Sequence, residues 1–558
     1  MNIDLRWQLL LAAICLALLV SVLGYQAQNV GLCTTRVAAS GGQIVEGVVG
    51  RPQYLNPLLS YQNPVDAELG DLIFDGLVRY GSDGQPQPDL ASSWQVSDDG
   101  QTFTFELREG ARWHDGRPVT AADVAFTYGL LKDESFPAQE SLRELWKSVV
   151  ISPTTSNQIS FVLPQPYGAF IDATTVGILP EHLLGDVAPE DIAGHTYNRA
   201  PVGTGPFLVT PGNDWLDAGY LRLAPNPLQW RQGVQVDFLD VRFFEDLPAL
   251  VAAISGGEIQ AVSSVPVEGI GVIGTLDDMR LFSAPAPRYS QVLFNMTDNG
   301  SDALSDVAIR QALAMGLDRE ALIDRAIEGQ GLPLEGPYLP QSWAYASGNI
   351  QPIAYQPEEA KARLEAGGWT APEGQNTRQK DGLDLVLRLL LVDEPRFRAL
   401  AAAAADMWVE IGVGAEIVAA TPEEFKVALA EGTFDLAIVD VDPGYDPDLY
   451  DFWSQEAIVR GQNYGGWNNR RASEALENAR RLTGPEERLP YYEAFQSYFD
   501  IDLPALTLYQ HVYTYGLSAE VYESDIGRID SPRDRYDTFG QWFLLFREVA
   551  SACSEASE

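Results

Sequence analysis

Residues 385–441 read LVLRLLLVDEPRFRALAAAAADMWVEIGVGAEIVAATPEEFKVALAEGTFDLAIVDV, and this stretch decides the fold of the second half of the chain. Alternate leucines at 385–391 predict a strand, and the apolar stripe at 400–411, stopped by a glycine, predicts a helix. A short strand, a helix capped by Thr421 and an apolar run at 436–439 follow. The order strand, helix, strand, helix, strand predicts a parallel α/β unit with right-handed crossovers.

Two loops of this unit are expected to face a functional cleft, because ligands of open α/β sheets bind beyond the carboxyl ends of the strands. These loops follow Val392 and Val439, and the second, residues 440–448, is the densest carboxylate cluster in the chain. It is either a ligand site or a solvated turn with helix-capping aspartates. A calcium loop is a third interpretation, with Asp440 and Asp442 at its first and third positions and Gly444 and Asp451 at later ones.

Composition excludes one class of partner. The chain has 558 residues and a formal charge of -41, so it cannot present the basic surface that nucleic acid requires. The acidity either draws cationic solutes toward a cleft or is simply a solvated surface. No catalytic or metal-binding signature stands out, and the glycines of residues 269–274 match a dinucleotide pattern only by letter. His114 belongs to a turn with Asp115 and Gly116.

The N-terminus predicts the compartment. Residues 7–25 carry no charge, residues 9–23 are almost wholly apolar, and Arg6 precedes them, which is typical of an export signal or a membrane anchor. We expect an uncleaved anchor with Arg6 inside. Cleavage, and lipidation at Cys33, are the alternatives. The body is therefore predicted to be extracytoplasmic, either tethered by this segment or exported through it.

A second stretch carries a resemblance to a known family. Residues 86–126 contain a Pro-x-Leu-Ala-x-x-Trp segment, an Asp-Gly turn, a strand, an Arg-x-Gly turn, a His-Asp-Gly turn and a Thr-Ala-x-Asp-Val helix start. This order resembles the peptide/nickel-type solute-binding proteins of ABC importers. Segments at 201–206, 307–318, 359–369 and 502–504 look similar to the same family in the same order, so the resemblance spans about residues 42–540.

The resemblance implies an α/β, two-lobed periplasmic-binding-protein fold of type II with an inserted subdomain. Residues 1–40 would be the anchor or signal segment and linker, and 546–558 a tail. The expected lobes and insertion are: lobe I, 41–70 with 200–286 and 508–545; inserted subdomain, 71–199; lobe II, 287–507.

The same resemblance implies a ligand site. In peptide-binding members an aspartate ahead of an Asp-Pro pair holds the ligand's amino terminus, and a carboxylate suits an ammonium group. Here Gly444 changes the spacing by one, so Asp442 is preferred and Asp440 stays an alternative. The other expected cleft residues are aromatic or border the ligand in relatives: Tyr54, Asn56, Tyr289, Gln291, Asn295, Tyr338, Trp343, Tyr345, Tyr445, Asn463, Tyr464 and Trp467.

The expected function is the extracytoplasmic substrate-binding component of an ABC importer, which passes a peptide or similar solute to a membrane permease. We expect no enzyme activity, cofactor, metal or nucleic acid, and a monomer. Cys33 and Cys553 would form a disulfide if both ends return to one lobe as in the family, and two free thiols are the alternative. The functional alternatives are an extracellular carboxylate-dependent hydrolase and a non-catalytic sensor or chaperone on the same fold.

Overall fold

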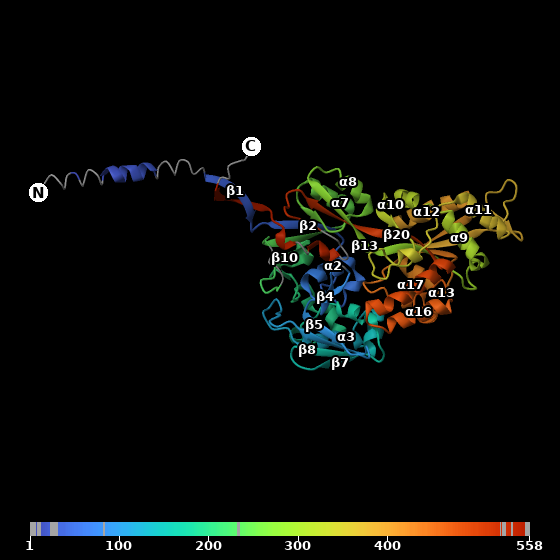
Figure 1. Ribbon diagram of the computed structural model, residues 1–558, viewed down its shortest axis with the longest axis horizontal. Helices are drawn as coiled ribbons and strands as arrows, with labels where there is room; N and C mark the ends of the chain where they lie inside the picture. The colour runs from blue at the N-terminus through green and yellow to red at the C-terminus, as the bar shows by residue number, and fades with distance from the viewer. Residues whose placement is uncertain are drawn as a thin grey trace.

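The computed structural model describes residues 7, 13–22, 32–81, 84–230, 235–524, 526, 532–536 and 539–552. Figure 1 shows an α/β body with residues 13–22 as a helix that lies away from it. Strand β1 (Leu32–Ala39) pairs antiparallel with β21 (Leu545–Ala552), so the first and last strands lie side by side. Cys33 stands opposite Ser551 in this pair, but Cys553 lies outside the described residues, and the disulfide stays a prediction.

One eleven-stranded sheet runs through both lobes in the order β18-β17-β19-β13-β20-β12-β2-β11-β10-β9, and β14 (Gly331–Pro333) also pairs with β20. Strands β13 (Met279–Phe294) and β20 (Ala505–Ser518) are long, pair antiparallel and join the two halves of the sheet. Their register shifts between Pro285 and Tyr289 and again between Ser290 and Gln291. The strands on the first-lobe side are β2 (Gln43–Val49), β9 (Phe207–Val209), β10 (Tyr220–Pro225), β11 (Phe238–Phe244) and β12 (Ala261–Val262).

The predicted parallel unit forms the far end of this sheet, and its elements follow in the predicted order. Strand β17 (Val386–Val392) is parallel to β18 (Gly414–Ala420) and to β19 (Leu436–Val441). Helix α12 (Pro395–Glu410) packs in the core on one face of the sheet, and α13 (Pro422–Glu431) packs in the core on the other. Thr421 and Glu424 form the capping box that starts α13.

The inserted region has its own four-stranded sheet, in the order β5-β6-β8-β7. Phe103, Phe105 and Leu107 of β6 (Thr102–Leu107) are buried and their neighbours are half-exposed, as their alternation predicts. The core of this region is continuous with the first-lobe core, so the exact domain boundaries stay a prediction. Its other elements are β5 (Ala91–Val96), α3 (Ala121–Lys132), α4 (Glu140–Lys147), β7 (Val150–Pro153) and β8 (Gln158–Val162).

His114 lies in the predicted turn and holds the inserted region to the first lobe. Its Nδ1 accepts from the backbone N–H of Gly203 at 3.2 Å, and its Nε2 donates to the carbonyl of Gly205 at 3.1 Å. Burial lowers the pKa of this imidazole, which favours its neutral form. Residues 269–274 lie in and just after helix α8 (Val267–Ile273) and not at a strand-to-helix turn, so the dinucleotide pattern has no matching structure there.

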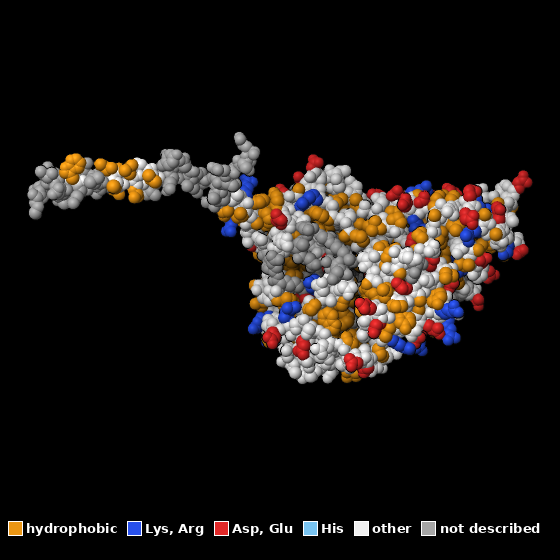
Figure 2. All heavy atoms as spheres, viewed as in Figure 1, with side chains coloured by type: hydrophobic (Ala, Val, Ile, Leu, Met, Phe, Trp, Pro, Cys, Tyr) orange, Lys and Arg blue, Asp and Glu red, His pale blue; other side chains and the backbone are white. Residues whose placement is uncertain are grey.

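Surface features bear on two further expectations. On the face seen in Figure 2, acidic side chains are spread over both lobes and do not gather in one patch. Within the described ranges, no helix has both the length and the apolar character needed to cross a membrane.

Candidate functional site

A cavity opens where the topology of the parallel unit reverses. The chain leaves β17 for β18 on one side, then returns past β17 to β19 on the other, so the crevice lies between the carboxyl ends of β17 and β19. The cavity has a volume of about 330 Å³, and we call it the switch-point cavity. Its walls are Gln291, Leu293, Val392, Phe397, Pro422, Phe425, Lys426, Leu429, Ile438, Val439, Asp440, Val441, Phe452, Trp453, Gln462 and Tyr464.

Asp440 lies at this cavity but is already neutralised. It sits inside strand β19 and not in the loop after it. Arg396 reaches its two oxygens at 2.7 and 3.2 Å, His511 Nε2 lies at 3.2 Å, and Ser290 donates its hydroxyl. Burial opposes ionisation, but the hydrogen bonds from His511 and Arg396 outweigh it and hold the pKa of Asp440 well below its usual range.

The other carboxylates at 446–451 are paired as well. Asp446 makes a bidentate pair with Arg488, a side chain that is only 2% exposed. Arg480 Nε lies 2.7 Å from Asp448, and its Nη2 lies 3.1 Å from Asp451.

Asp442 differs from these four carboxylates. It is exposed, and its Oδ1 accepts from the backbone N–H of Gly444 at 3.1 Å. Among the described residues it has no basic partner, so of the carboxylates at 440–451 it alone can take a cation without breaking an existing ion pair.

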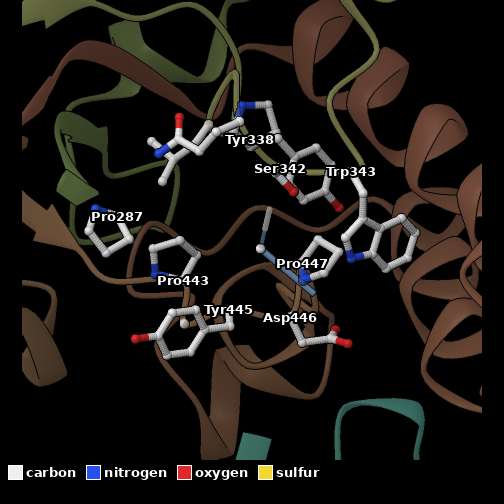
Figure 3. A pocket seen from close by; sticks show the side chains of 13 residues that line it. Pro287, Tyr338, Ser342, Trp343, Pro443, Tyr445, Asp446 and Pro447 are labelled. Atoms are coloured by element: carbon white, nitrogen blue, oxygen red, sulfur yellow. The ribbon is translucent and has the colours of Figure 1, made fainter. Parts of the chain in front are cut away.

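A second, smaller space lies on the other side of the same loop, bordered by second-lobe residues and by Gly84 of the inserted region. This interlobe gap has a volume of about 50 Å³. Figure 3 shows Tyr445 and Asp446 on one side of it and Tyr338 and Trp343 on the other.

Direct contacts of the inserted region with the second lobe close this gap. The ring of Tyr445 stacks on Tyr80 at 4.1 Å, with 7° between the planes. Asp172 accepts from the backbone N–H of Asp446 at 2.8 Å and from the hydroxyl of Tyr80. Burial of Asp172, together with the nearby charge of Asp446, raises the pKa of the Asp172 carboxyl to about 7. The inserted region and the second lobe are therefore in direct contact.

The structure divides the remaining expected cleft residues between cavities and core. Gln291 and Tyr464 line the switch-point cavity, while Tyr338, Trp343 and Tyr445 line the interlobe gap. Tyr289 is buried beside the loop, Tyr54 is half-buried in the first-lobe core, and Tyr345 packs against the second-lobe core.

The polar groups of four other expected residues are hydrogen-bonded within the protein. Trp467 packs on Trp453 and donates to Asp502 at 2.9 Å. The amide of Asn463 bonds the backbone of residues 454 and 467. Asn295 bonds the carbonyls of Gly432 and Phe434, and Asn56 donates to Asn198. Ligand contact by any of the expected residues stays a prediction.

The calcium interpretation has little support in the geometry. Two of its four positions, Asp440 and Asp451, are paired with arginines. In the described part of the chain, no group of three or more His, Cys, Asp or Glu side chains is placed to hold a metal ion.

Sequence reasoning missed the residues that complete the site. Arg396 and Arg488 are paired with aspartates 44 and 42 residues away in the sequence. Local sequence patterns do not reveal pairs that are so far apart in the chain. Phe397 and Phe425 carried a signal, because they are apolar residues in the first turns of α12 and α13, the helices that follow β17 and β18.

The fold is that of a two-lobed solute-binding protein, with a cavity at a switch point of the second lobe. Residues 85–458 match the family model described as "Bacterial extracellular solute-binding proteins, family 5 Middle". The chain belongs to this family, which places its work outside the cytoplasm.

Several known proteins are similar along most of the chain. The oligopeptide-binding protein AppA of Bacillus subtilis is 25% identical over 479 residues, 84% of this chain and 86% of that protein. Protein XP55 of Streptomyces lividans is 28% identical over 477 residues, covering 84% and 83%. The crystal structure of CtaP from Listeria monocytogenes has a TM-score of 0.77 at 22% identity, covering 90% of this chain and 99% of that one. AppA with a bound nonapeptide has a TM-score of 0.71 at 22% identity, covering 91% and 100%.

Proposed function

We propose that this protein captures a peptide or similar small solute that carries a free amino group, and delivers it to an ABC permease. The observation that carries the proposal is Asp442, an exposed carboxylate with no basic partner among the described residues, beside four carboxylates that are all paired. An ammonium group would form a charge-assisted hydrogen bond there. The names of similar proteins support this ligand class, since AppA is called oligopeptide-binding and an Escherichia coli relative is a probable D,D-dipeptide-binding protein.

Capture would use closure of the lobes about strands β13 and β20, the two long strands that join them. A solute drives closure only if it binds the closed form more tightly than the open form. A solute held by Asp442 would meet this condition by also touching the inserted region, which Tyr445 and Asp446 of the same loop contact in the closed form.

The N-terminal segment would tether the protein to the outer face of the membrane. Its helix at 13–22 stands away from the body with Leu16 66% exposed and Val20 61% exposed, which suits burial in lipid. The mature protein would act as a monomer, with lobes and inserted subdomain bounded as the sequence predicts.

Calorimetry with tri-alanine tests the proposed amine site. Asp442→Asn should weaken binding by at least about 1.5 kcal/mol, the lower range for a hydrogen bond to a charged group. Asp393→Asn is the matched control, because Asp393 is also an exposed carboxylate at the end of a parallel strand but is paired with Arg398. N-acetylated tri-alanine, which lacks the ammonium group, should bind the wild type and Asp442→Asn equally weakly. Equal affinity of wild type and Asp442→Asn for tri-alanine would remove Asp442 from the site.

The same peptide, tri-alanine, separates capture from hydrolysis. Tri-alanine incubated with the purified protein should be recovered intact, as measured by mass spectrometry. Release of alanine that grows with protein concentration would contradict a pure carrier and favour the hydrolase alternative.

A further inference from the structure

Two buried polar groups on the walls of the switch-point cavity have no hydrogen-bond partner among the described residues. The side-chain oxygen of Gln291 is an acceptor on a residue that is 3% exposed, and the indole N–H of Trp453 is a donor on a residue that is 2% exposed. Buried polar groups in proteins are almost always hydrogen-bonded, since an unmade bond leaves the cost of desolvation uncompensated. Finding one acceptor and one donor unpaired on the same cavity therefore points to a ligand.

The rest of the cavity is suited to an uncharged, apolar group. The sheet contributes Leu293, Val392 and Val439, and the first turns of α12 and α13 contribute Phe397 and Phe425. Asp440 is already neutralised by Arg396, and Lys426, the lysine on the wall, is exposed. A charged side chain would thus lose its hydration in the cavity without gaining a buried partner.

We propose that the switch-point cavity binds one apolar residue of a peptide-like solute. Its aliphatic or aromatic side chain packs against the sheet and the two helices, and its backbone pairs with Gln291 and Trp453. Each residue of a peptide carries one N–H donor and one C=O acceptor, which matches the two unpaired groups. The volume of about 330 Å³ accommodates a large side chain and its peptide group. This assignment rests on the proposed peptide capture. It adds a preference for an apolar residue at one position of the peptide.

Peptide series measured by calorimetry on the full chain test the preference. The probes are triglycine and its three single-leucine and three single-aspartate relatives, with the substituted residue at each position in turn. At one position leucine should tighten binding at least about tenfold over glycine, as expected for burial of an apolar side chain. Aspartate at that position should bind no better than glycine.

Filling the cavity should remove this preference. Val439→Phe adds apolar volume to the cavity wall and should bring the leucine-to-glycine affinity ratio close to one. Val418→Phe is the matched control, because Val418 belongs to the same parallel unit, is 38% exposed on β18 and is not part of the cavity wall. It should leave the ratio unchanged.

Gln291→Leu should change thermal stability and peptide affinity in opposite directions. Removing a buried acceptor that has no partner should raise the melting temperature of the free protein and weaken the best leucine peptide at least threefold. Gln496→Leu is the control, because that buried amide is bonded to the backbone of Ala346 at 3.1 and 3.2 Å. This change should lower the melting temperature and leave the affinity ratio as it is.

The outcomes separate the two proposals. If the peptides bind but show no preference for leucine at any position, or keep that preference in Val439→Phe, this assignment of the cavity is wrong and peptide capture stands. If none of the peptides binds the full chain, peptide capture is itself contradicted, and the assignment falls with it.

Discussion

The switch-point cavity and the interlobe gap lie on either side of the loop after β19, and they differ in their contact with the inserted region. At the gap, Asp446 is held by Arg488, and Asp172 accepts two hydrogen bonds. The walls of the cavity come from residues 291–464 alone. Among the described residues, polar groups without a partner occur at both spaces: Gln291 and Trp453 at the cavity, and Tyr338 and Gln341 at the gap. The comparison teaches that the charged contacts closing the lobes lie outside the walls of the cavity. Closing contacts can therefore be altered without touching the cavity.

The largest expected effect comes from breaking the ion pair at the gap. Arg488→Met leaves the Asp446 carboxylate partly buried and uncompensated, and should lower the free energy of unfolding by about 3–5 kcal/mol. Urea unfolding followed by tryptophan fluorescence measures it. Arg470→Met is the control, because Arg470 and Glu474 form an exposed pair whose loss should cost below about 1 kcal/mol. Equal effects of the two changes would show that the buried pair contributes no more to the free energy of unfolding than the exposed pair.

A smaller effect should follow from a methyl group placed between the lobes. An alanine Cβ at Gly168 would lie 2.0 Å from the carbonyl oxygen of Leu482 in the second lobe, so Gly168→Ala should disfavour closure by roughly 1–3 kcal/mol. Small-angle X-ray scattering should then give a larger radius of gyration than that of the wild type. Gly194→Ala, whose Cβ would meet nothing within 4 Å, should scatter like the wild type. An unchanged curve for Gly168→Ala would mean that the lobes are already apart in solution.

Closure should also depend on pH through Asp172. Its pKa is raised to about 7 in the closed form from an ordinary value of 3.8, so closing takes up a proton between these values. Protonation of Asp172 favours closure at low pH, and this contribution is lost as the pH rises through about 7. The equilibrium constant for closure should change by less than about tenfold per pH unit. Scattering curves from pH 5 to 8.5 should show opening with rising pH. Asp172→Asn should remove the dependence, and a variant that keeps it would assign the effect to another group.

The smallest effect should come from the stacked rings. Tyr445→Leu removes the ring that lies 4.1 Å from Tyr80 and should weaken closure by about 0.5–1.5 kcal/mol. The midpoint of the pH titration should shift modestly toward lower pH, since closure then needs more help from protonation. The leucine preference of the cavity should not change. A lost preference would show that gap and cavity are coupled.

Most of the second-lobe fold could be predicted, because each element carries its own local signal. The alternating leucines, the capping box at Thr421 and the apolar run before Asp440 gave strands and helices in the right order. The order in turn located the switch point, where the cavity lies. The placement of Asp440 in the loop was wrong by a short margin, because β19 continues to Val441.

The aromatic candidates were harder to judge, because the same side chain serves a core or a cleft. Tyr445 and Trp343 line the interlobe gap, whereas Trp467 is buried against Trp453 and Phe499. Neighbouring glycines and asparagines do not distinguish these cases, since they report the backbone turn and not what packs on the ring.

Sequence by itself determined where a ligand should be sought, because strand order and the position of carboxyl ends follow from local periodicity and from the handedness of crossovers. Only the tertiary structure decided which carboxylates are free. Asp440 meets Arg396 and His511 from 44 and 71 residues away, while Asp442, two residues further on, meets no cation among the described residues. The physical reason is that a charge is neutralised by neighbours in space, which residues distant in the chain provide only after folding.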